Sequence, residues 1–270
     1  MAYRKARDAR GGVKSCLRAL DVIDYFCRTG TGARTIDISK ALDVPNSSMD
    51  ELLRTLADTG YLSFDPATKY YSPSYKLIAA ARGIERDFFG DNGIMELLQD
   101  LRVATGASAF LNLQKGCLME TVAEVPGRWT IDVKYTNEVV YFDEGHWKPG
   151  TTFAAVLLAQ QSNVGVVALA ARAQSLGVGP AGPALMKQLV DRVALTRSLG
   201  FAFGRRNGKI VDSLAMPFQL PRVATPYAVG IVGDALFENE KDVTSMAAAV
   251  RDVVLTHVAR LRQAPQAALH

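Results

Sequence analysis

Apolar residues recur at helical spacing twice between residues 35 and 60. Residues 35–42 predict a short helix, and Asp43-Val44-Pro45 breaks it because proline cannot continue a helix and restricts the residue before it. A second helix is expected to open near Asn46-Ser47-Ser48 and to end at Gly60, which suits the left-handed position after a helix. One face of this second helix carries Met49, Leu52, Leu53 and Leu56.

A β-hairpin is predicted directly after these helices. Residues 61–64 and 69–71 form its two strands, and Asp65-Pro66-Ala67-Thr68 forms the turn between them. Ser48 and Glu51 have the spacing of a capping box at the start of the second helix. This order of elements is typical of a winged helix-turn-helix. A helix pair and hairpin inside some other α+β domain would give the same pattern.

Two further helices flank this segment. Residues 15–27 form the first, and residues 74–86 form the second, with Ser74 as its cap. The second helix would join the two halves of the chain, and its mixture of apolar and charged residues also suits contact with a second subunit. The predicted buried stripe of the first helix is Cys16, Leu20, Ile23 and Cys27.

Beyond residue 91 the chain alternates between helical and strand patterns, and two of the strands flank a turn at Lys115-Gly116. A sheet with helices segregated around it predicts an α+β domain. The helices are expected at 94–105, 152–161, 184–199 and 241–261, and the strands at 107–113, 118–125, 130–135, 139–142, 201–203, 210–215 and 227–232.

The composition, with 49% hydrophobic and 21% charged residues, is that of a globular protein. The sequence contains no run of about 18 apolar residues, so no membrane span is predicted. The charged N-terminus is not followed by the apolar segment of a secretory signal. The three cysteines are expected to be small buried hydrophobes, which is consistent with a reducing cytoplasm.

Positive charge gathers in the first 18 residues, although the net charge of the chain is only +4. Such an arm is either a solvated tail or, beside a helix-turn-helix, a contact to phosphates or to a minor groove. The nearly neutral remainder suits a domain that binds a small molecule. The basic residues of the arm are Arg4, Lys5, Arg7, Arg10, Lys14 and Arg18.

The sequence displays no catalytic or metal-binding motif. Its histidines, His146, His257 and His270, stand in no metal-ligand spacing, and there is no nucleophile elbow and no phosphate-binding loop. We therefore expect no catalytic residue, no metal, no cofactor and no enzymatic activity.

Short motifs in the first half resemble the N-terminal domain of the isocitrate-lyase-regulator (IclR) family of bacterial transcription factors. These motifs are S-C-L-R-A-L at 15–20, I-S-K-A-L-D-V-P-N-S-S at 38–48 and L-L-R-T-L-A-D-T-G-Y-L at 52–62. The second half follows the plan of that family more loosely. The resemblance implies a basic arm at 1–14, a winged helix-turn-helix at 15–73, a linker helix at 74–90 and a GAF-like α/β effector-binding domain at 91–264.

In such a domain the first turn of the second helix enters the DNA major groove. Family members usually carry basic or neutral residues where this chain has Asp50 and Glu51, and acidic groups near phosphates are costly unless they accept from cytosine or face away. The expected readers of bases and phosphates are Asn46, Ser47, Ser48, Met49 and Arg54, and the expected clamps on the DNA backbone are Arg18, Arg34, Thr35, Lys40 and Lys69.

The resemblance also implies an effector site near Thr152, where the family holds a ligand carboxylate on the backbone N–H groups of a helix start. Ser213 takes one polar position of the family, whereas Gly230 and Val232 replace two serines. Fewer hydroxyls, and space at Gly230, favour an aromatic acid or a phenolic compound. The expected lining is Tyr135, Tyr141, Trp147, Thr152, Phe153, Ser213, Met216 and Ile231.

Together these features predict a cytoplasmic, ligand-responsive regulator of a catabolic operon. Two helix-turn-helix units that read a palindromic double-stranded operator need two-fold symmetry, so we expect a homodimer or tetramer. The alternative is a small-molecule sensor or enzyme-like module whose N-terminal helical domain binds protein rather than DNA.

Overall fold

The computed structural model describes residues 13–89, 93–128, 139–140, 149–175, 183–205, 211–220 and 224–263. The chain divides into two compact units, Met1–Glu85 and Arg86–His270, so the boundary falls inside helix α5 (Tyr75–Phe89). Ser74 caps α5 as predicted, because its hydroxyl accepts the Lys76 N–H at 3.2 Å. None of the described helices is long and apolar enough to cross a membrane.

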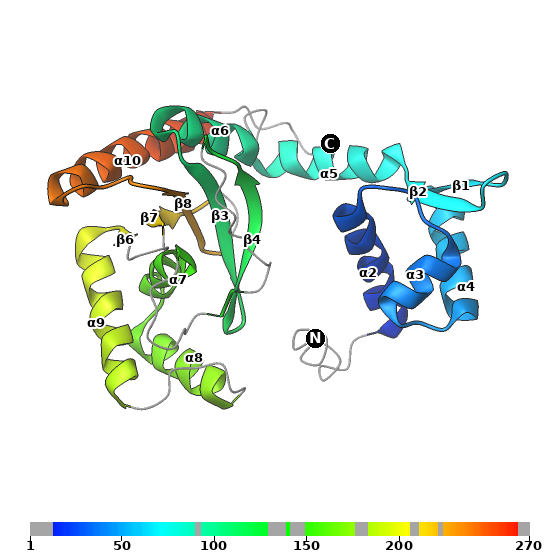
Figure 1. The fold of residues 1–270 in the computed structure, drawn as a ribbon, viewed down its shortest axis with the longest axis horizontal. Helices are drawn as coiled ribbons and strands as arrows, with labels where there is room; N and C mark the ends of the chain where they lie inside the picture. The colour runs from blue at the N-terminus through cyan, green and yellow to red at the C-terminus, as the bar shows by residue number, and fades with distance from the viewer. Residues whose placement is uncertain are drawn as a thin grey trace. The chain divides into compact units, whose positions relative to one another are not determined.

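The first unit is the winged helix-turn-helix that the sequence predicts (Figure 1). Its two strands are antiparallel, with Leu62 opposite Pro73. Tyr71 extends the hairpin by a bridge to Ala33, through two backbone hydrogen bonds of 2.9 and 3.0 Å. The elements are α2 (Lys14–Thr29), α3 (Thr35–Leu42), α4 (Asn46–Asp58), β1 (Leu62–Asp65) and β2 (Tyr70–Pro73).

The predicted C-terminal end of α4 is confirmed, whereas its predicted N-terminal cap is not. Gly60 follows the helix with a φ of 79°, and the Tyr61 N–H donates to the Leu56 carbonyl at 2.8 Å, so the predicted glycine stop is confirmed. The predicted capping box is wrong. Pro45 occupies the cap position and no side chain caps the helix, because α4 opens directly after this proline and Ser48 already lies in its first turn.

The first unit has its own hydrophobic core, and α2 enters it by a different face than predicted. Val22 and Phe26 are buried, whereas Cys16 and Cys27 are exposed and Leu20 is 55% exposed. The predicted stripe lies about a quarter turn away around the helix axis, on a surface that α3 and α4 do not cover. The main members of this core are Val22, Phe26, Ile38, Leu42, Met49, Leu53, Leu62 and Tyr71.

In the part of the chain that the structure describes, the second unit has a six-stranded antiparallel sheet in the order β5-β4-β3-β8-β7-β6. The strands are β3 (Ser108–Lys115), β4 (Leu118–Val125), β5 (Val139–Val140), β6 (Ala202–Gly204), β7 (Asp212–Phe218) and β8 (Tyr227–Gly233). The helices are α6 (Ile94–Thr105), α7 (Pro149–Ala159), α8 (Asn163–Ser175), α9 (Pro183–Leu199) and α10 (Glu240–Gln263).

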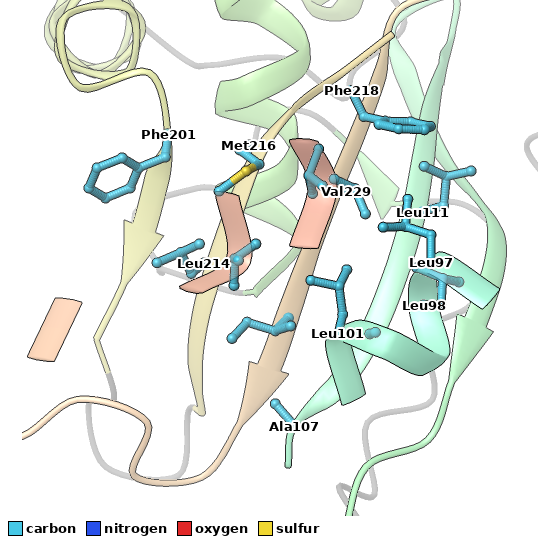
Figure 2. Packing of buried hydrophobic residues seen from close by; sticks show 14 of the residues in the cluster. Leu97, Leu98, Leu101, Ala107, Leu111, Phe201, Leu214, Met216, Phe218 and Val229 are labelled. Atoms are coloured by element: carbon cyan, nitrogen blue, oxygen red, sulfur yellow. The ribbon is translucent and has the colours of Figure 1, made fainter. Parts of the chain in front are cut away.

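The sheet separates two hydrophobic cores. Helices α6 and α10 pack on one face, while α7 packs on the other and α9 lies against α7 and β6. Figure 2 shows the first core, where Leu97 and Leu101 of α6 meet Leu214 and Val229 of the sheet. Because successive side chains of a strand point to opposite faces, Leu214 belongs to this core whereas the adjacent Ser213 faces α7.

The predicted elements of the second half that fall on described residues are present, with shifts of a few residues at their ends. The predicted strand 130–135 and residues 141–142 lie outside the described residues. Helix α8 was not predicted. Its Val164 is 80% exposed and its Val167 is 49% exposed, so apolar residues around this helix give no clear amphipathic period.

Candidate nucleic-acid interface and effector site

The first turn of α4 presents polar side chains to solvent. Asn46 and Ser47 are exposed and Ser48 is half-buried, so each can reach a ligand at the start of the helix. Met49 is fully buried in the core of the first unit. Its inclusion among the DNA-contacting residues is therefore corrected, because the side chain points to α2 and α3 rather than outward.

Two basic side chains pack against aromatic rings of the hairpin. Lys69 occupies a left-handed position at the hairpin turn, with φ of 61°, and its Nζ lies 5.9 Å from the centroid of the Phe64 ring. The Arg34 guanidinium lies 5.3 Å from the centroid of the Tyr70 ring. These cation–π contacts hold both cations against the exposed aromatic side of the hairpin.

The turn of the hairpin is organised by one carboxylate. Asp65 accepts a hydrogen bond from the Thr68 hydroxyl at 2.6 Å and from the Ala67 N–H at 2.9 Å. The pKa of Asp65 is lowered, chiefly by the Thr68 hydrogen bond and then by the Ala67 N–H, since both favour the ionised form. The turn thus keeps a negative charge next to Lys69.

The remaining predicted backbone clamps lie on the helices. Arg18 is half-buried on α2, Thr35 is half-buried at the start of α3, and Lys40 is exposed at the last turn of α3. The predicted clamp cations thus lie on α2, at both ends of α3 and on the hairpin.

Arg54 has two partners that the sequence-based interpretation missed. Its Nη2 lies 2.8 Å from a carboxylate oxygen of Asp50, and its charge opposes the rise that burial causes in the pKa of the Tyr71 hydroxyl. The spacing of four residues on a helix is a visible signal for the first partner. No spacing in the sequence indicates the second, because Tyr71 arrives from the hairpin.

In the second unit, Thr152 and Ser213 meet although they come from different elements. The Thr152 hydroxyl of α7 and the Ser213 hydroxyl of β7 lie 2.6 Å apart, and both residues are fully buried. Either oxygen is able to donate. The structure therefore brings together the two predicted hydroxyl-bearing effector residues on the α7 side of the sheet.

Phe153 is buried next to this pair, and its ring packs edge-on against Phe110 of β3 with centroids 6.2 Å apart. Helix α7 begins at Pro149, three residues before the expected start. Thr152 and Phe153 therefore lie past the first residues of the helix, and the anion contact expected at their backbone N–H groups stays a prediction.

The structure separates two other predicted residues from this group. Met216 and Ile231 belong to the core under α6 and α10, on the opposite face of the sheet from Ser213. The alternation of side chains along a strand gives the reason, since Ser213 and Met216 are an odd number of residues apart. The predicted residues Tyr135, Tyr141 and Trp147 lie outside the described residues.

The expected space at Gly230 is also corrected. A Cβ atom built on this glycine would lie 2.2 Å from the Leu214 carbonyl oxygen and 2.7 Å from the Ala215 Cα. The glycine thus serves close contact between β7 and β8, where it pairs with Ala215. Among the described residues, no group of three or more His, Cys, Asp or Glu side chains could hold a metal ion.

Comparisons with known proteins agree with this architecture. Residues 15–66 match the sequence model of the IclR helix-turn-helix domain. The HTH-type transcriptional regulator XynR of Escherichia coli (strain K12) is 25% identical over 208 residues, which cover 76% of this chain and 80% of that protein.

Solved structures with low sequence identity share the fold. The IclR transcriptional regulator from Alicyclobacillus acidocaldarius has a TM-score of 0.66 at 18% identity, over 92% of this chain and 98% of that chain. An IclR homologue complexed with 4-hydroxybenzoate from Microbacterium hydrocarbonoxydans has a TM-score of 0.64 at 12% identity, over 91% of this chain and 99% of that chain.

A winged helix-turn-helix followed by an α/β domain with an antiparallel sheet defines a class of two-domain transcriptional regulators. Within this class, residues 15–66 carry an IclR helix-turn-helix domain, and the chain is similar over 76% of its length to an HTH-type transcriptional regulator from Escherichia coli.

Proposed function

We propose that this protein is a cytoplasmic repressor or activator that binds double-stranded operator DNA and responds to a small aromatic acid or phenolic compound. The observation that carries the DNA-binding part is the exposed start of α4 beside a hairpin that presents Lys69 and packs against Arg34 at the start of α3. A positively charged hairpin next to a solvent-facing helix start fits a phosphate backbone on both sides of a major groove.

The proposed DNA contacts fall into two groups. Asn46, Ser47 and Ser48 would contact base edges and phosphates from α4, because amides and hydroxyls suit adenine and phosphate oxygens. The proposed clamps on the DNA backbone are Arg18, Arg34, Thr35, Lys40 and Lys69.

Fluorescence anisotropy with duplexes from the region of the protein's own gene tests this assignment. Lys69→Gln should weaken binding to every duplex and should reduce the slope of log K against log salt by about 0.9. Asn46→Ala should instead reduce the preference for one sequence. If no duplex binds, or if salt has no effect, the N-terminal unit binds a protein partner instead.

We also propose a homodimer or tetramer on a palindromic operator. The observation that supports self-association is apolar surface on α5, where Tyr75 is 70%, Ile78 47% and Ile84 59% exposed. On α2, Val13 is 67% and Leu20 55% exposed. Isoleucine and leucine on the surface of a helix are expected to be covered by a partner when several of them occur together.

Light scattering after size exclusion measures the oligomeric state. Ile78→Glu should shift the mass of the wild-type assembly toward that of one chain, because burying the new carboxylate in an apolar interface is costly. Val164→Glu is a matched control on α8, where the valine is 80% exposed. A monomeric wild-type protein at micromolar concentration would contradict the proposal.

The effector is proposed to bind on the α7 side of the sheet, near Thr152, Ser213 and Phe153. The N-terminal end of α7 suits a carboxylate, and the Phe110–Phe153 pair suits an aromatic ring. A homologue of similar fold is complexed with 4-hydroxybenzoate, which supports the same ligand class here.

Thermal-shift assays compare ligand classes directly. Benzoate and 4-hydroxybenzoate should raise the melting temperature more than pyruvate or glyoxylate at equal concentration, since ligands that bind only the folded state stabilise it. Stabilisation by the small acids alone would exclude an aromatic effector. A switch at a promoter needs coupling of only about 1–3 kcal/mol between the effector site and DNA.

A further inference from the structure

A cavity of about 310 Å³ lies between α9 and β6, at the end of the sheet away from β5. Within the described strands, β6 pairs with β7 alone, so no further strand covers this edge. The volume is near the lower end of the range for ligand pockets, roughly 300–1,000 Å³, which suits a small organic molecule. The cavity is lined from α9 and β6 and not from α7, so it is separate from the proposed effector site.

One stripe of α9 forms an apolar wall of this cavity. Leu195 and Leu199 are four residues apart, so they are neighbours on the helix surface. Leu195 is 55% exposed and Leu199 is 38% exposed. The adjacent stripe of the helix, which includes Val193, is the one that packs in the core with α7. Because that stripe already attaches α9 to the domain, the two exposed leucines remain available to a ligand.

Two phenylalanines form the opposite wall. Phe201 precedes β6 and Phe203 lies within it, and both line the cavity. Their ring centroids are 6.2 Å apart, and the rings are inclined by 40° to each other. Phe201 is buried in the core under α6 and α10 (Figure 2), whereas Phe203 is half-buried at its edge. The cavity thus has apolar side chains on two sides, which favour a hydrocarbon group over water.

Arginines from three elements lie at or beside the cavity. Arg192 of α9 and Arg205, directly after β6, are part of its lining. Arg251 of α10 is close by, since a Cβ atom built on Gly200 would lie 3.8 Å from its Nη2. Arg205 donates from Nη2 to the Glu238 carbonyl oxygen at 2.7 Å. Because a carbonyl oxygen carries no net charge, this contact positions the guanidinium without neutralising it.

Arg192 is half-buried, and its removal from water lowers its pKa from 12.5 to about 10. The group still carries its positive charge at neutral pH. A carboxylate in the cavity would offset the lost hydration, because hydrogen bonds between ionised groups are stronger away from bulk water. The lining therefore combines a cationic part with an apolar part.

We propose that this cavity is a second small-molecule site, which binds an aliphatic carboxylate of medium chain length. The carboxylate would meet Arg192 and Arg205, because a guanidinium matches the planar geometry of a carboxylate. The chain would lie between the two leucines and the two phenylalanines, where branched side chains and inclined rings suit a flexible chain better than a flat ring. The inference goes beyond the proposed function and needs neither the DNA nor the effector on the α7 side.

Isothermal titration calorimetry of the full-length protein with three probes tests the site. Octanoate has both the carboxylate and the chain, octan-1-ol has the chain without the charge, and acetate has the charge without the chain. Octanoate should bind one site per chain. It should bind at least about tenfold more tightly than either other probe, because each of them lacks one half of the recognition.

Two variants assign the binding to this cavity. Arg192→Gln should weaken octanoate binding about tenfold, the scale of one lost charge-assisted hydrogen bond. Leu195→Ser should weaken it about threefold, because part of the apolar wall is lost. The matched controls on α8, Arg172→Gln and Val164→Ser, are exposed and should change nothing. Thermal melts confirm that each variant is folded.

Three results would overturn the inference. The first is that octanoate does not bind, and the second is that Arg192→Gln has no larger effect than Arg172→Gln. The third is that Leu195→Ser lowers the mass of the wild-type assembly in light scattering, because a second copy of the chain then covers this face. Octanoate should also bind equally well in the presence of saturating 4-hydroxybenzoate. Competition between the two would place octanoate in the effector site and contradict a second site.

Discussion

The hydroxyls of Thr152 and Ser213, 61 residues apart in the sequence, lie 2.6 Å from each other in the interior of the second unit. This contact connects helix α7 to strand β7 on the face of the sheet where we propose the effector site. Both hydroxyls are fully buried, and the hydrogen bond between them gives each of these polar groups a partner away from water. The pair therefore contributes to the packing of the face on which we propose that the effector binds.

Breaking this hydrogen bond from one side should destabilise the second unit. Thr152→Val or Ser213→Ala leaves one buried hydroxyl without its partner, so we expect the free energy of unfolding to fall by about 1–3 kcal/mol. The double variant should lose less than the sum of the two, because no buried hydroxyl remains. Urea unfolding followed by circular dichroism measures all three, and additive losses would contradict a direct hydrogen bond.

Lowering the pH should decrease the stability of the second unit because of His257. This side chain is fully buried, and neither ring nitrogen has a hydrogen-bond partner in the described part of the chain. Burial lowers its pKa below 6.5, although the Glu96 and Asp100 carboxylates on α6 oppose that shift and Arg260 adds to it. Arg260 itself pairs with Glu96 at 3.2 Å and with Asp100 at 3.4 Å.

The sign of the pH effect follows from this lowered pKa. As the pH falls below 6.5, the unfolded chain takes up a proton on His257 before the folded protein does, so stability decreases toward acid. Above pH 6.5 this contribution should be constant. This is checked by measuring the melting temperatures of the wild type and His257→Phe between about pH 5 and 8. The melting temperature of the variant should change less with pH. Equal slopes would mean that other groups dominate.

Gly230 should not tolerate a methyl group. The added Cβ of Gly230→Ala would lie 2.2 Å from the Leu214 carbonyl oxygen, so β7 and β8 must move apart, at a cost of about 1–3 kcal/mol. Gly83→Ala is the matched control. No atom lies within 4 Å of its added Cβ, and alanine in a helix should be stabilising by about 0.5–1 kcal/mol. Thermal unfolding compares the two.

Substitutions at Met49 and Asn46, which lie one turn apart on α4, should have different effects. The first should lower stability, and the second should change DNA binding. Met49→Ala empties a fully buried position and should cost about 2–5 kcal/mol of stability. Asn46→Ala removes an exposed side chain, so stability should hardly change while the preference for one DNA sequence falls. Melting curves and anisotropy on the same samples make the comparison. A stable Met49→Ala protein would contradict the buried position.

Much of the first unit follows from local sequence. Pro45 and Gly60 bracket α4, and the turn at 65–68 donates its own hydrogen bonds to the Asp65 carboxylate. The helices and the hairpin are therefore predicted close to their observed bounds. The rotation of α2 about its axis was not predicted. Apolar residues lie on more than one side of that helix, and only its neighbours decide that Val22 and Phe26 are buried while Leu20 is not.

The sequence by itself determined the type and order of most described elements, though not α8, and the family resemblance indicated the segments where we propose DNA and ligand binding. The tertiary structure alone decided which candidates share a site. Periodicity defines faces within one element, but it cannot state which element covers a face. The meeting of Thr152 with Ser213, the placing of Met216 in the opposite core, and the pairing of Ala33 with Tyr71 all depend on packing between distant segments.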